Sequence, residues 1–347
     1  MKLGAIEIGA EHRPFIIVEM SGNHNQSLER ALKIVGEVKK TGTQMLKLQT
    51  YTADTLTLDV EDGEFLINDE DSLWKGHSLH SLYQEAHTPW EWHKQIIDKA
   101  KMLGLVCFSS VFDESSVDYL ENLNVPAYKI ASQECIHHPL IRRVAETGKP
   151  IVISTGMASL GEIDEAINII RKTSSSDIVL MKCTSSYPAS PDNSNVLTIP
   201  FLRKIFDCEV GLSDHTLGIG ASIAAVAHGA TLIEKHFTLS RKDGGVDSAF
   251  SLEPFEMKML VEETERAWQA IGNVLIGPTE AEKSSMSGRR SIYIARDILS
   301  GEELNQENMK VIRPNLGLAP KYYDFVLGKK VNKDTPKGTP LSWDLLY

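Results

Sequence analysis

Residues 15–35, FIIVEMSGNHNQSLERALKIV, contain the structural unit that decides the fold of this chain. A short apolar run at 15–20 is rich in β-branched residues and predicts a strand. After a polar loop, apolar residues recur with the period of a helix, and Ser27 stands where that helix would be capped. The stretch therefore predicts one strand, one polar loop and one helix.

The same unit recurs along residues 15–272, and we count eight copies of it. The predicted strands cover residues 15–20, 44–50, 105–109, 126–131, 150–155, 177–183, 209–213 and 231–237. The predicted helices begin near Ser27, Pro89, Asp113, His138, Ser159, Asn195, Thr216 and Pro254. Because parallel strands need a crossover connection, usually a helix, this alternation predicts an α/β fold, a parallel sheet closed into a (β/α)₈ TIM barrel. An open, doubly wound sheet is the alternative.

The periodic pattern ends at residue 272, and the sequence beyond it predicts a different organisation. Residues 273–290 are enriched in Gly, Pro and Ser, which is typical of a linker. Residues 291–347 contain two similar strand-and-turn segments and predict a small second domain. With only about 57 residues this domain is small for independent stability, so we expect it to lean on the barrel or on another subunit.

The charge and the cysteines of the chain exclude several classes of protein. Its 347 residues carry a formal net charge of −11, which argues against a nucleic-acid surface because such a surface needs basic side chains. No apolar run approaches the roughly 18 residues of a membrane span, and Glu7 and Glu11 interrupt the apolar core that a signal peptide would need. The four cysteines show no CxxC spacing, which suits reduced thiols. We therefore expect a cytoplasmic protein without a membrane or nucleic-acid partner.

The loop after the second predicted strand is longer than the other connections of the predicted barrel. It runs from Tyr51 to about His87, whereas connections in compact domains usually span a few residues. A connection this long on a compact barrel is usually functional.

Charged side chains stand where several of the apolar strands end. Catalytic residues of a barrel collect at the carboxyl ends of its strands, and Lys47 and Lys129 occupy such positions. An unpaired ammonium group is costly in a packed core, so we expect an anion between these lysines. With serine and threonine hydroxyls at other strand ends, they suit a phosphate and carboxylate cradle of the kind that holds phosphoenolpyruvate or a sugar phosphate. Lys235, between Glu234 and His236, is expected to face away from this site.

His215 and His236 end the seventh and eighth predicted strands, which are neighbours in a closed barrel. Two imidazoles on neighbouring strand ends can share one divalent ion such as Mn²⁺. Glu19 or a substrate oxygen could complete the coordination. Other histidines, including His93, lie on predicted loops or helix starts and are interpreted as surface or loop residues.

Two further carboxylates follow predicted strands. Glu134 follows the fourth strand and could act as a general acid or base, with a solvated loop carboxylate as the simple alternative. Asp247 follows the eighth strand on a glycine-containing loop and suits the binding of sugar hydroxyl groups.

These strand ends belong to longer motifs. They are NHNQS (23–27), LKLQTY (46–51), KIASQE (129–134), ISTGMAS (153–159), KCTSSYP (182–188), GLSDHTLG (211–218), IEKHFTL (233–239), GGVDSAFSLEP (244–254), RRSIYIARDI (289–298) and IRPNLGLAP (312–320). Through them the whole chain resembles the sialic acid synthase family, whose members condense phosphoenolpyruvate with an N-acetylated amino sugar. The resemblance implies a TIM barrel followed by a small antifreeze-protein-like (SAF) domain.

The resemblance also implies roles for individual residues. His215 and His236 would hold the divalent metal ion, Mn²⁺ first and Mg²⁺ or Co²⁺ as alternatives. Phosphoenolpyruvate would be held by Lys47, Lys129, Ser132, Ser154, Thr184 or Ser185, and Ser213. The carboxylates of Glu19 and Glu134 would lie near the reacting atoms. The residues that would face the sugar are Asn23, Gln49, Tyr187, Asp247 and Arg313.

Members of this family form domain-swapped homodimers, which implies the same partner for this chain. In such a dimer the small domain would lend Arg313, from the IRP motif, to the active site of the other subunit. The small size of the predicted second domain makes such lending physically reasonable.

Within the family, EMSGNHN (19–25) and LWKGHSLHSLYQEAHTPWEWH (73–93) look like the pseudaminic acid synthase branch. That branch would use 2,4-diacetamido-2,4,6-trideoxy-L-altrose as acceptor and release phosphate by C–O cleavage. The segment SQECIHHPL (132–140) departs from the family pattern and borders the expected sugar site. The alternatives within the family are N-acetylneuraminate or legionaminic acid synthesis. Outside it they are a non-catalytic carbohydrate-binding protein and an aldolase with a Schiff base on Lys129 or Lys182.

Overall fold

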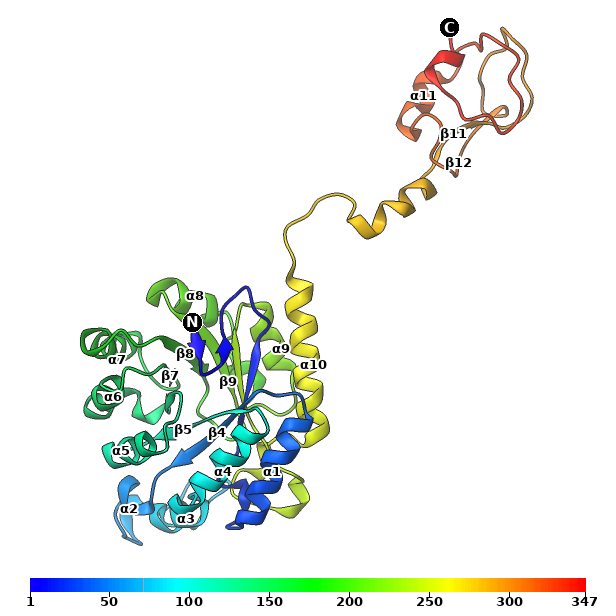
Figure 1. The fold of residues 1–347 in the computed structure, drawn as a ribbon. Helices are drawn as coiled ribbons and strands as arrows, with labels where there is room; N and C mark the ends of the chain where they lie inside the picture. The colour runs from blue at the N-terminus through cyan, green and yellow to red at the C-terminus, as the bar shows by residue number, and fades with distance from the viewer. Residues whose placement is uncertain (71) are drawn as a thin grey trace. The chain divides into compact units, whose positions relative to one another are not determined.

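The computed structural model describes residues 1–70 and 72–347. They form two compact units, Met1–Gly272 and Asn273–Tyr347. Within the described part of the first unit, eight parallel strands close into a barrel with helices around it (Figure 1). The predicted TIM barrel is therefore confirmed, and the alternative of an open sheet is wrong. Across the described residues, no helix is long and apolar enough to cross a membrane.

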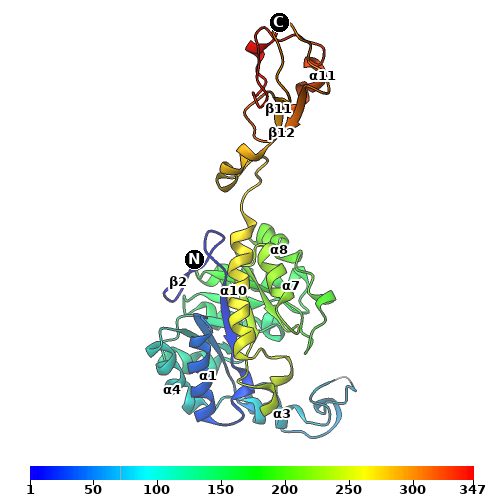
Figure 2. The same ribbon diagram turned by 90° about the vertical axis from the view of Figure 1, so that its right-hand side faces the viewer.

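Strands and helices alternate along the barrel as the sequence predicts. The barrel strands are β3 (Phe15–Glu19), β4 (Met45–Thr50), β5 (Val106–Val111), β6 (Tyr128–Ile130), β7 (Ile151–Ser154), β8 (Ile178–Cys183), β9 (Glu209–Asp214) and β10 (Leu232–His236). The main helices are α1 (Leu28–Lys40), α4 (Trp90–Met102), α5 (Glu114–Asn122), α6 (His138–Ala145), α7 (Leu160–Thr173), α8 (Thr198–Phe206), α9 (Gly220–Ala227) and α10 (Pro254–Ile271). The strand β10 pairs with both β9 and β3, which closes the ring. Figure 2 shows α10 beside α1, where the helix layer closes as well.

Side chains alternate along each strand between the barrel interior and the helix layer. Val18 and Leu46 belong to the large apolar cluster that the strands form with the helices. Ile17, Met45 and Phe108 belong to a second apolar cluster, which fills the barrel interior. Closer to the carboxyl ends of the strands the inward positions become polar, and these positions form the site described below.

A short N-terminal hairpin, which the sequence pattern does not predict, packs against the barrel interior. Its strands are β1 (Lys2–Leu3) and β2 (Ile6–Glu7). Leu3 and Ile8 are buried in the same apolar cluster as the inward side chains of the barrel strands. The interior is therefore filled by apolar side chains below the polar layer.

Helix starts agree with the prediction where the sequence supplies a capping side chain. Ser27, Asp113 and Ser159 each accept a hydrogen bond from a backbone N–H of the first helical turn. Such caps satisfy N–H groups that have no partner inside the helix. The loops that precede these helices are thereby fixed at the barrel mouth.

The helices α8 and α9 start a few residues later than predicted, at Thr198 and Gly220. The reason for α9 is that the backbone of Thr216 still belongs to the barrel. Its N–H donates to Asp214 Oδ1 at 2.8 Å, and its carbonyl oxygen accepts a hydrogen bond from Lys235. Lys235 is fully buried against Asp214 and, as expected, does not line the mouth.

The long connection between β4 and α4 is not an irregular loop. It contains α2 (Ala53–Leu56), the 3₁₀ helix η2 (Gly63–Phe65) and α3 (Leu79–Ala86). Further 3₁₀ helices follow other strands, namely η1 (Ser21–His24), η3 (Gln133–Ile136), η4 (Pro191–Asn193), η5 (Arg241–Asp243) and η6 (Ser248–Phe250).

The second unit has its own apolar core. The strand β11 (Ser291–Ile294) pairs antiparallel with β12 (Met309–Ile312). The helices of this unit are η7 (Glu280–Glu282), η8 (Ser284–Gly288), η9 (Pro320–Tyr322), α11 (Tyr323–Val326) and η10 (Trp343–Leu345). Ile292, Leu304 and Val331 are buried in its centre. Residues from Asn273 onward are grouped with this unit, so the linker boundaries at 273–290 stay a prediction.

Candidate active site at the carboxyl ends of the strands

Buried lysine and glutamate side chains meet inside the barrel mouth. Lys47 on β4 forms an ion pair with Glu19 on β3, and its Nζ lies 3.5 Å from Glu234 Oε1. Lys129 on β6 donates to Glu234 Oε2 at 2.8 Å. These side chains are at most 5% exposed. Glu234 thus supplies a negative charge between the two lysines.

Burial and mutual charge set the ionisation of this cluster. Burial raises the pKa of Glu234, but Lys129 and Lys47 outweigh burial and lower that pKa to about 2. Burial lowers the pKa of Lys129, and the attraction of Glu234 only partly offsets this effect. Burial also raises the pKa of Glu19 above its usual value, although Lys47 opposes the change. Glu234 is therefore the fixed counter-charge, and Glu19 is the carboxyl group of the cluster that takes up a proton more easily.

Hydroxyl groups and a glycine form a small recess beside the lysines. The Gly156 N–H donates to Ser132 Oγ at 3.2 Å, and a side chain at position 156 would collide with the hydroxyls of Ser132 and Ser185. Ser154 Oγ is buried and has no hydrogen-bond partner among the described residues. Buried polar atoms are normally paired, so this recess suits a small group with oxygen atoms that accept hydrogen bonds.

His215 and His236 lie side by side, with ring centroids 5.4 Å apart. His215 Nδ1 is 2.9 Å from the carbonyl oxygen of Thr184, which leaves its Nε2 for a ligand. His236 Nδ1 is buried and has no hydrogen-bond partner among the described residues, and the nearby carboxylate oxygen Asp247 Oδ2 lies 3.6 Å from it. A buried nitrogen without a hydrogen bond beside a second imidazole fits a pair of metal ligands.

The chain offers such an ion few further ligands. In residues 1–70 and 72–347, no group of three or more His, Cys, Asp or Glu side chains could hold a metal. Glu19, predicted as a further ligand, is engaged by Lys47 and by the Ser21 N–H at 2.8 Å. The remaining coordination positions would therefore fall to water or to substrate oxygen.

The structure gathers most of the predicted site residues around two adjoining pockets. The predicted residues that line the inner pocket are Glu19, Lys47, Gln49, Lys129, Ser132, Ser154, Tyr187, Ser213, His215 and His236. The outer pocket, of about 280 Å³, shares Gln49, Tyr187 and His236 with it and adds Asp247. The inner pocket is ionic, whereas the outer pocket has aromatic walls from the long β4–α4 connection.

Thr184 and Ser185 were the two candidates for one hydroxyl of the phosphoenolpyruvate site. The Thr184 hydroxyl donates to the carbonyl oxygen of Asn193 at 2.9 Å. Ser185 Oγ instead faces Gly156 and the recess. Ser185 is therefore the better placed of the two.

Four predicted site residues of the barrel line neither pocket in the described part of the chain, namely Asn23, Glu134, Thr184 and Ser185. Asn23 Nδ2 donates to the Phe237 carbonyl oxygen at 2.9 Å and to Ser251 Oγ at 2.8 Å, so it ties loops together. Arg313 is exposed and belongs to the second unit, and its role toward the sugar stays a prediction.

Glu134 lies on η3, and burial raises the pKa of its carboxyl group to about 7. Because the raised pKa exceeds the ordinary value of 4.5, the folded state binds a proton that the unfolded state releases. The associated stability is fully present below pH 4.5 and is lost as the pH rises through about 7. At neutral pH this carboxyl group can both accept and donate a proton, as general acid–base catalysis requires.

We expect Glu134→Gln to lower kcat by about 10²-fold, since general acid–base groups contribute 10² or more. At pH 8 the free energy of unfolding of this variant should exceed that of the wild type by about 1–3 kcal/mol. At pH 4.5 the two proteins should be equally stable, because the carboxyl group is then protonated in the folded wild type. Thermal unfolding at both pH values and a pH–rate profile measure this, with the exposed Glu85→Gln as control. Equal stability of Glu134→Gln and wild type at pH 8 would show that the carboxyl group is not buried as described.

Glu234 is a central residue of the site for which the sequence pattern predicts no role. It lines the inner pocket, as do Ser110, Gln133 and Cys183. The signal was available for Glu234, because residues two apart on a strand share a face and Glu234 precedes His236 by two. No such signal marks Cys183, whose Sγ lies 3.9 Å from His215 Nδ1.

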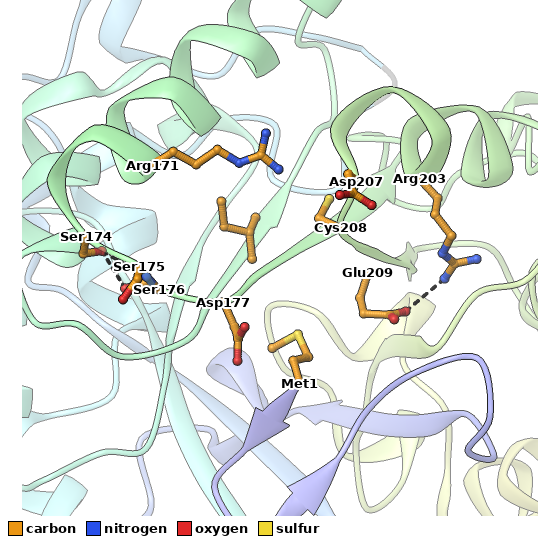
Figure 3. A pocket seen from close by; sticks show the side chains of 11 residues that line it. Met1, Arg171, Ser174, Ser175, Ser176, Asp177, Arg203, Asp207, Cys208 and Glu209 are labelled. Atoms are coloured by element: carbon orange, nitrogen blue, oxygen red, sulfur yellow. Dashed lines mark hydrogen bonds and ion pairs between the residues drawn. The ribbon is translucent and has the colours of Figure 1, made fainter.

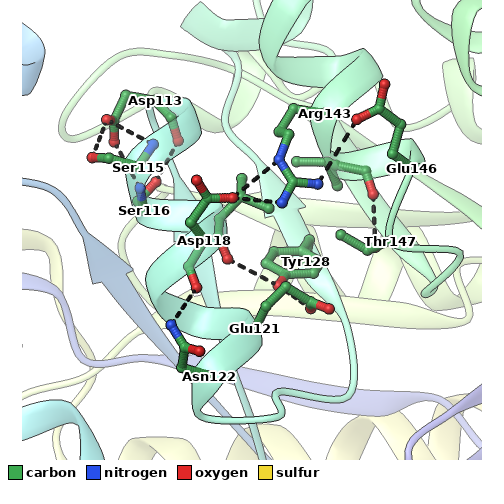
Figure 4. Close-up of polar contacts among 12 residues, drawn as sticks. Asp113, Ser115, Ser116, Asp118, Glu121, Asn122, Tyr128, Arg143, Glu146 and Thr147 are labelled. Atoms are coloured by element: carbon green, nitrogen blue, oxygen red, sulfur yellow. Dashed lines mark hydrogen bonds and ion pairs between the residues drawn. The ribbon is translucent and has the colours of Figure 1, made fainter.

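Polar contacts outside the barrel fix the strand that carries Lys129 (Figure 4). Tyr128 on β6 donates its hydroxyl to Glu121 Oε1 on α5 at 2.5 Å. Arg143 on α6 pairs with Asp118 on α5 at 2.5 Å. Because successive residues of a strand face opposite sides, the outward tie of Tyr128 directs Lys129 into the mouth.

A larger cavity, of about 610 Å³, lies at the amino ends of β8 and β9 (Figure 3). Arg171, Ser174 and Asp177 line it, and Arg203 pairs with Glu209 at 3.1 Å on its wall. Active sites of TIM barrels lie at the carboxyl ends of the strands. The described residues of this cavity also contribute no buried, unpaired polar side-chain atom. We therefore place the active site in the mouth, not here.

Comparison with known proteins agrees with this arrangement. Residues 34–275 match the NeuB family, and residues 289–346 match the SAF domain. The pseudaminic acid synthase of Helicobacter pylori is 41% identical, with 95% of this chain and 97% of that protein covered. The N,N'-diacetyllegionaminic acid synthase of Legionella pneumophila is 35% identical, with 97% and 95% covered. Among solved structures, the chain is similar to the crystal structure of N-acetylneuraminic acid synthetase from Leptospira borgpetersenii in complex with citrate. The two superpose with a TM-score of 0.73 at 30% sequence identity, and the match covers 82% of this chain and 94% of the Leptospira chain. The chain belongs to the NeuB family and carries a SAF domain at its C-terminal end.

Proposed function

We propose that this protein is a pseudaminic acid synthase. It condenses phosphoenolpyruvate with 2,4-diacetamido-2,4,6-trideoxy-L-altrose and water, and it releases pseudaminic acid and phosphate. The observation that carries the proposal is the buried lysine pair, Lys47 and Lys129, beside the recess where Ser154 Oγ is unpaired in the described structure. Family membership supports the same reaction, because relatives named for it match nearly the full chain.

The inner pocket suits phosphoenolpyruvate because cations and hydroxyl donors converge there. An ammonium group carries three N–H donors, so Lys129 can bind Glu234 and still donate to a substrate oxygen. Lys47 donates to Glu19 and to Ser110 Oγ and lies near Glu234, so it contributes mainly its positive charge. The recess formed by Ser132, Ser154 and Gly156 would take one anionic group of the substrate. Charge-assisted hydrogen bonds of this kind are about twice as strong as neutral ones.

The proposed reaction forms one carbon–carbon bond. C3 of phosphoenolpyruvate attacks the aldehyde carbon of the open-chain sugar, and the aldehyde oxygen takes up a proton. Water then adds to the cationic C2, with Glu19 or Glu134 accepting its proton. The tetrahedral intermediate breaks its C2–O bond to phosphate, which leaves the C2 ketone of the product. The lysines hold the phosphate throughout and thereby fix the attacking carbon relative to the aldehyde.

We also propose that His215 and His236 hold a divalent ion, with Mn²⁺ first and Mg²⁺ or Co²⁺ as alternatives. When bound, such an ion would polarise the aldehyde oxygen of the acceptor. The support is the pair of adjacent imidazoles and the buried His236 Nδ1, which has no hydrogen-bond partner among the described residues.

The outer pocket supports a trideoxy, diacetamido acceptor. Tyr51, Trp74 and Tyr83 give it aromatic walls, and Gln49 and Asp247 supply polar groups beside them. An acceptor with a C6 methyl and two acetyl methyl groups can contact such walls without leaving hydroxyl groups unpaired. Legionaminic acid synthesis is the second candidate, because its diacetamido acceptor offers similar groups and a relative of that name is 35% identical.

We further propose a cytoplasmic, domain-swapped homodimer in which Arg313 serves the site of the other subunit. The support for the exchange is the exposed position of Arg313 in a separate unit.

The proposal is tested with purified protein, Mn²⁺ and phosphoenolpyruvate. Phosphate release is measured with the altrose acceptor, with the acceptor for legionaminic acid and with N-acetylmannosamine. We expect release to depend on an acceptor and to be fastest with the altrose sugar. Faster turnover of another acceptor contradicts the proposed specificity, and no turnover with any of them contradicts the function.

A further inference from the structure

The outer pocket has one wall that links three loops of the barrel mouth. Trp74, in the connection between β4 and α4, donates its indole N–H to the Val246 carbonyl oxygen at 2.9 Å. Its ring also lies 5.8 Å from the ring of Tyr187, which follows β8. Val246 precedes Asp247 in the loop after β10, so the indole joins the three loops that surround the pocket.

Trp74 is the outermost member of a row of rings that reaches the inner pocket. Tyr187 packs 4.4 Å from His215 and 5.4 Å from Phe250, measured between ring centroids. Phe250 in turn packs 5.0 Å from His236. A ligand that extends outward from the two histidines would therefore pass along Tyr187 toward Trp74.

The hydrogen bond of the indole determines what this wall can recognise. Tryptophan has a single polar hydrogen and no acceptor, and that hydrogen is used by the Val246 carbonyl oxygen. A sugar hydroxyl that faces the ring would find no partner there, and an unpaired buried hydroxyl is unfavourable. A methyl or acetyl group in the same place gains contact area without this penalty.

We propose that Trp74 is a specificity-determining residue, whose indole face selects acceptors that present methyl and acetamido groups over acceptors that present hydroxyl groups. This inference rests on the proposed function, and it adds the residue that sets the choice of sugar. The Trp74–Val246 hydrogen bond holds the wall in place, and the ring itself provides the discrimination. Hydrophobic pockets discriminate against an added hydroxyl by about 10²-fold at most, which bounds the expected effect.

The test compares kcat/KM of the altrose acceptor with that of N-acetylmannosamine in the wild type and in three variants. Trp74→Ala removes the wall, and we expect its preference for the altrose acceptor to fall by about 10–100-fold. Trp74→Phe keeps an apolar ring without the N–H and should retain most of the preference. Leu73→Ala alters the adjacent exposed side chain and should behave as the wild type. KM for phosphoenolpyruvate should change less than about twofold in every variant.

The outcomes distinguish the two proposals. Suppose that the wild type prefers the altrose acceptor and that Trp74→Ala keeps this preference, for example because kcat/KM falls equally for both acceptors. The proposed role of Trp74 is then wrong, while the proposed function stands. If the wild type prefers N-acetylmannosamine, both the proposed acceptor and the role of Trp74 are wrong. If Trp74→Ala does not fold, Trp74→Phe provides the test. Loss of the acceptor preference in Trp74→Phe would show that the indole N–H hydrogen bond, and not the apolar ring, sets the preference, and this result would overturn the proposal.

Discussion

Replacing Lys129 by Met is expected to lower kcat/KM for phosphoenolpyruvate by about 10³-fold, because truncating one partner of a buried charge pair costs about 2–5 kcal/mol. Lys129 Nζ lies 2.8 Å from Glu234 Oε2, and the lysine side chain is 2% exposed, so water cannot easily replace it. When Lys129 is lost, Glu234 keeps an ion pair only with Lys47, whose Nζ lies 3.5 Å from Glu234 Oε1 in the described structure. The free energy of unfolding of the variant should also be lower than that of the wild type by about 3–5 kcal/mol.

A double variant separates stability from substrate binding. Lys129→Met combined with Glu234→Gln removes both charges of the pair, so we expect most of the lost stability to return. Activity should stay low, since the pocket has still lost a cation that faces the substrate. If the double variant regains wild-type kcat/KM, Lys129 serves only to balance Glu234, and the proposed phosphoenolpyruvate site is wrong.

Lys149→Met is the matched control, because it also removes a lysine paired with a glutamate. Lys149 Nζ lies 2.5 Å from Glu121 Oε1 on the outer side of the barrel. We expect its kcat/KM to stay within about threefold of the wild type, since a partly exposed pair contributes about 1 kcal/mol or less. Steady-state kinetics and thermal unfolding of all the variants provide the comparison. Borohydride trapping on Lys129 in the wild type would instead favour the Schiff-base aldolase.

Removal of divalent metal ions is expected to lower turnover by at least about 10²-fold, because a metal ion supplies several kcal/mol of charge stabilisation. Treatment with a chelator should abolish phosphate release, and added Mn²⁺ should restore it. His236→Ala should stay inactive after Mn²⁺ is added, because one of the two proposed imidazole ligands is then missing.

Binding of Mn²⁺ alone gives a readout that does not depend on activity. A ligand that binds only the folded state raises Tm, so Mn²⁺ should raise Tm of the wild type but not of His215→Ala or His236→Ala. His12→Ala, at an exposed position, should respond as the wild type does. Full turnover by protein from which the metal has been removed, verified by elemental analysis, would contradict the metal proposal.

The sequence predicts the barrel well because every repeat carries two independent signals. Each apolar strand is followed by a periodic helix, and side chains such as Ser27 and Ser159 mark helix starts by capping them. The N-terminal hairpin is missed because strands of two residues, Lys2–Leu3 and Ile6–Glu7, are too short to show a period.

The candidate site is predicted where the polar residue stands at the end of an apolar strand, as Glu19 and His236 do. What the sequence leaves open are the pairings across the barrel. Lys129 and Glu234 are 105 residues apart, and only the closed barrel shows that they meet. The interpretation of His93 as a surface or loop residue is wrong. This histidine is fully buried on α4, and its Nε2 lies 2.8 Å from Thr50 Oγ1.

In the proposed reaction the barrel mouth joins phosphoenolpyruvate to an amino sugar with cleavage of the C–O bond. The most direct measurement follows ¹⁸O placed at the bridging oxygen of phosphoenolpyruvate, in an incubation with the altrose acceptor and in one without it. We expect phosphate to form only with the acceptor and to carry the label. Label retained in the sugar product, or labelled phosphate released at the same rate without acceptor, would contradict it.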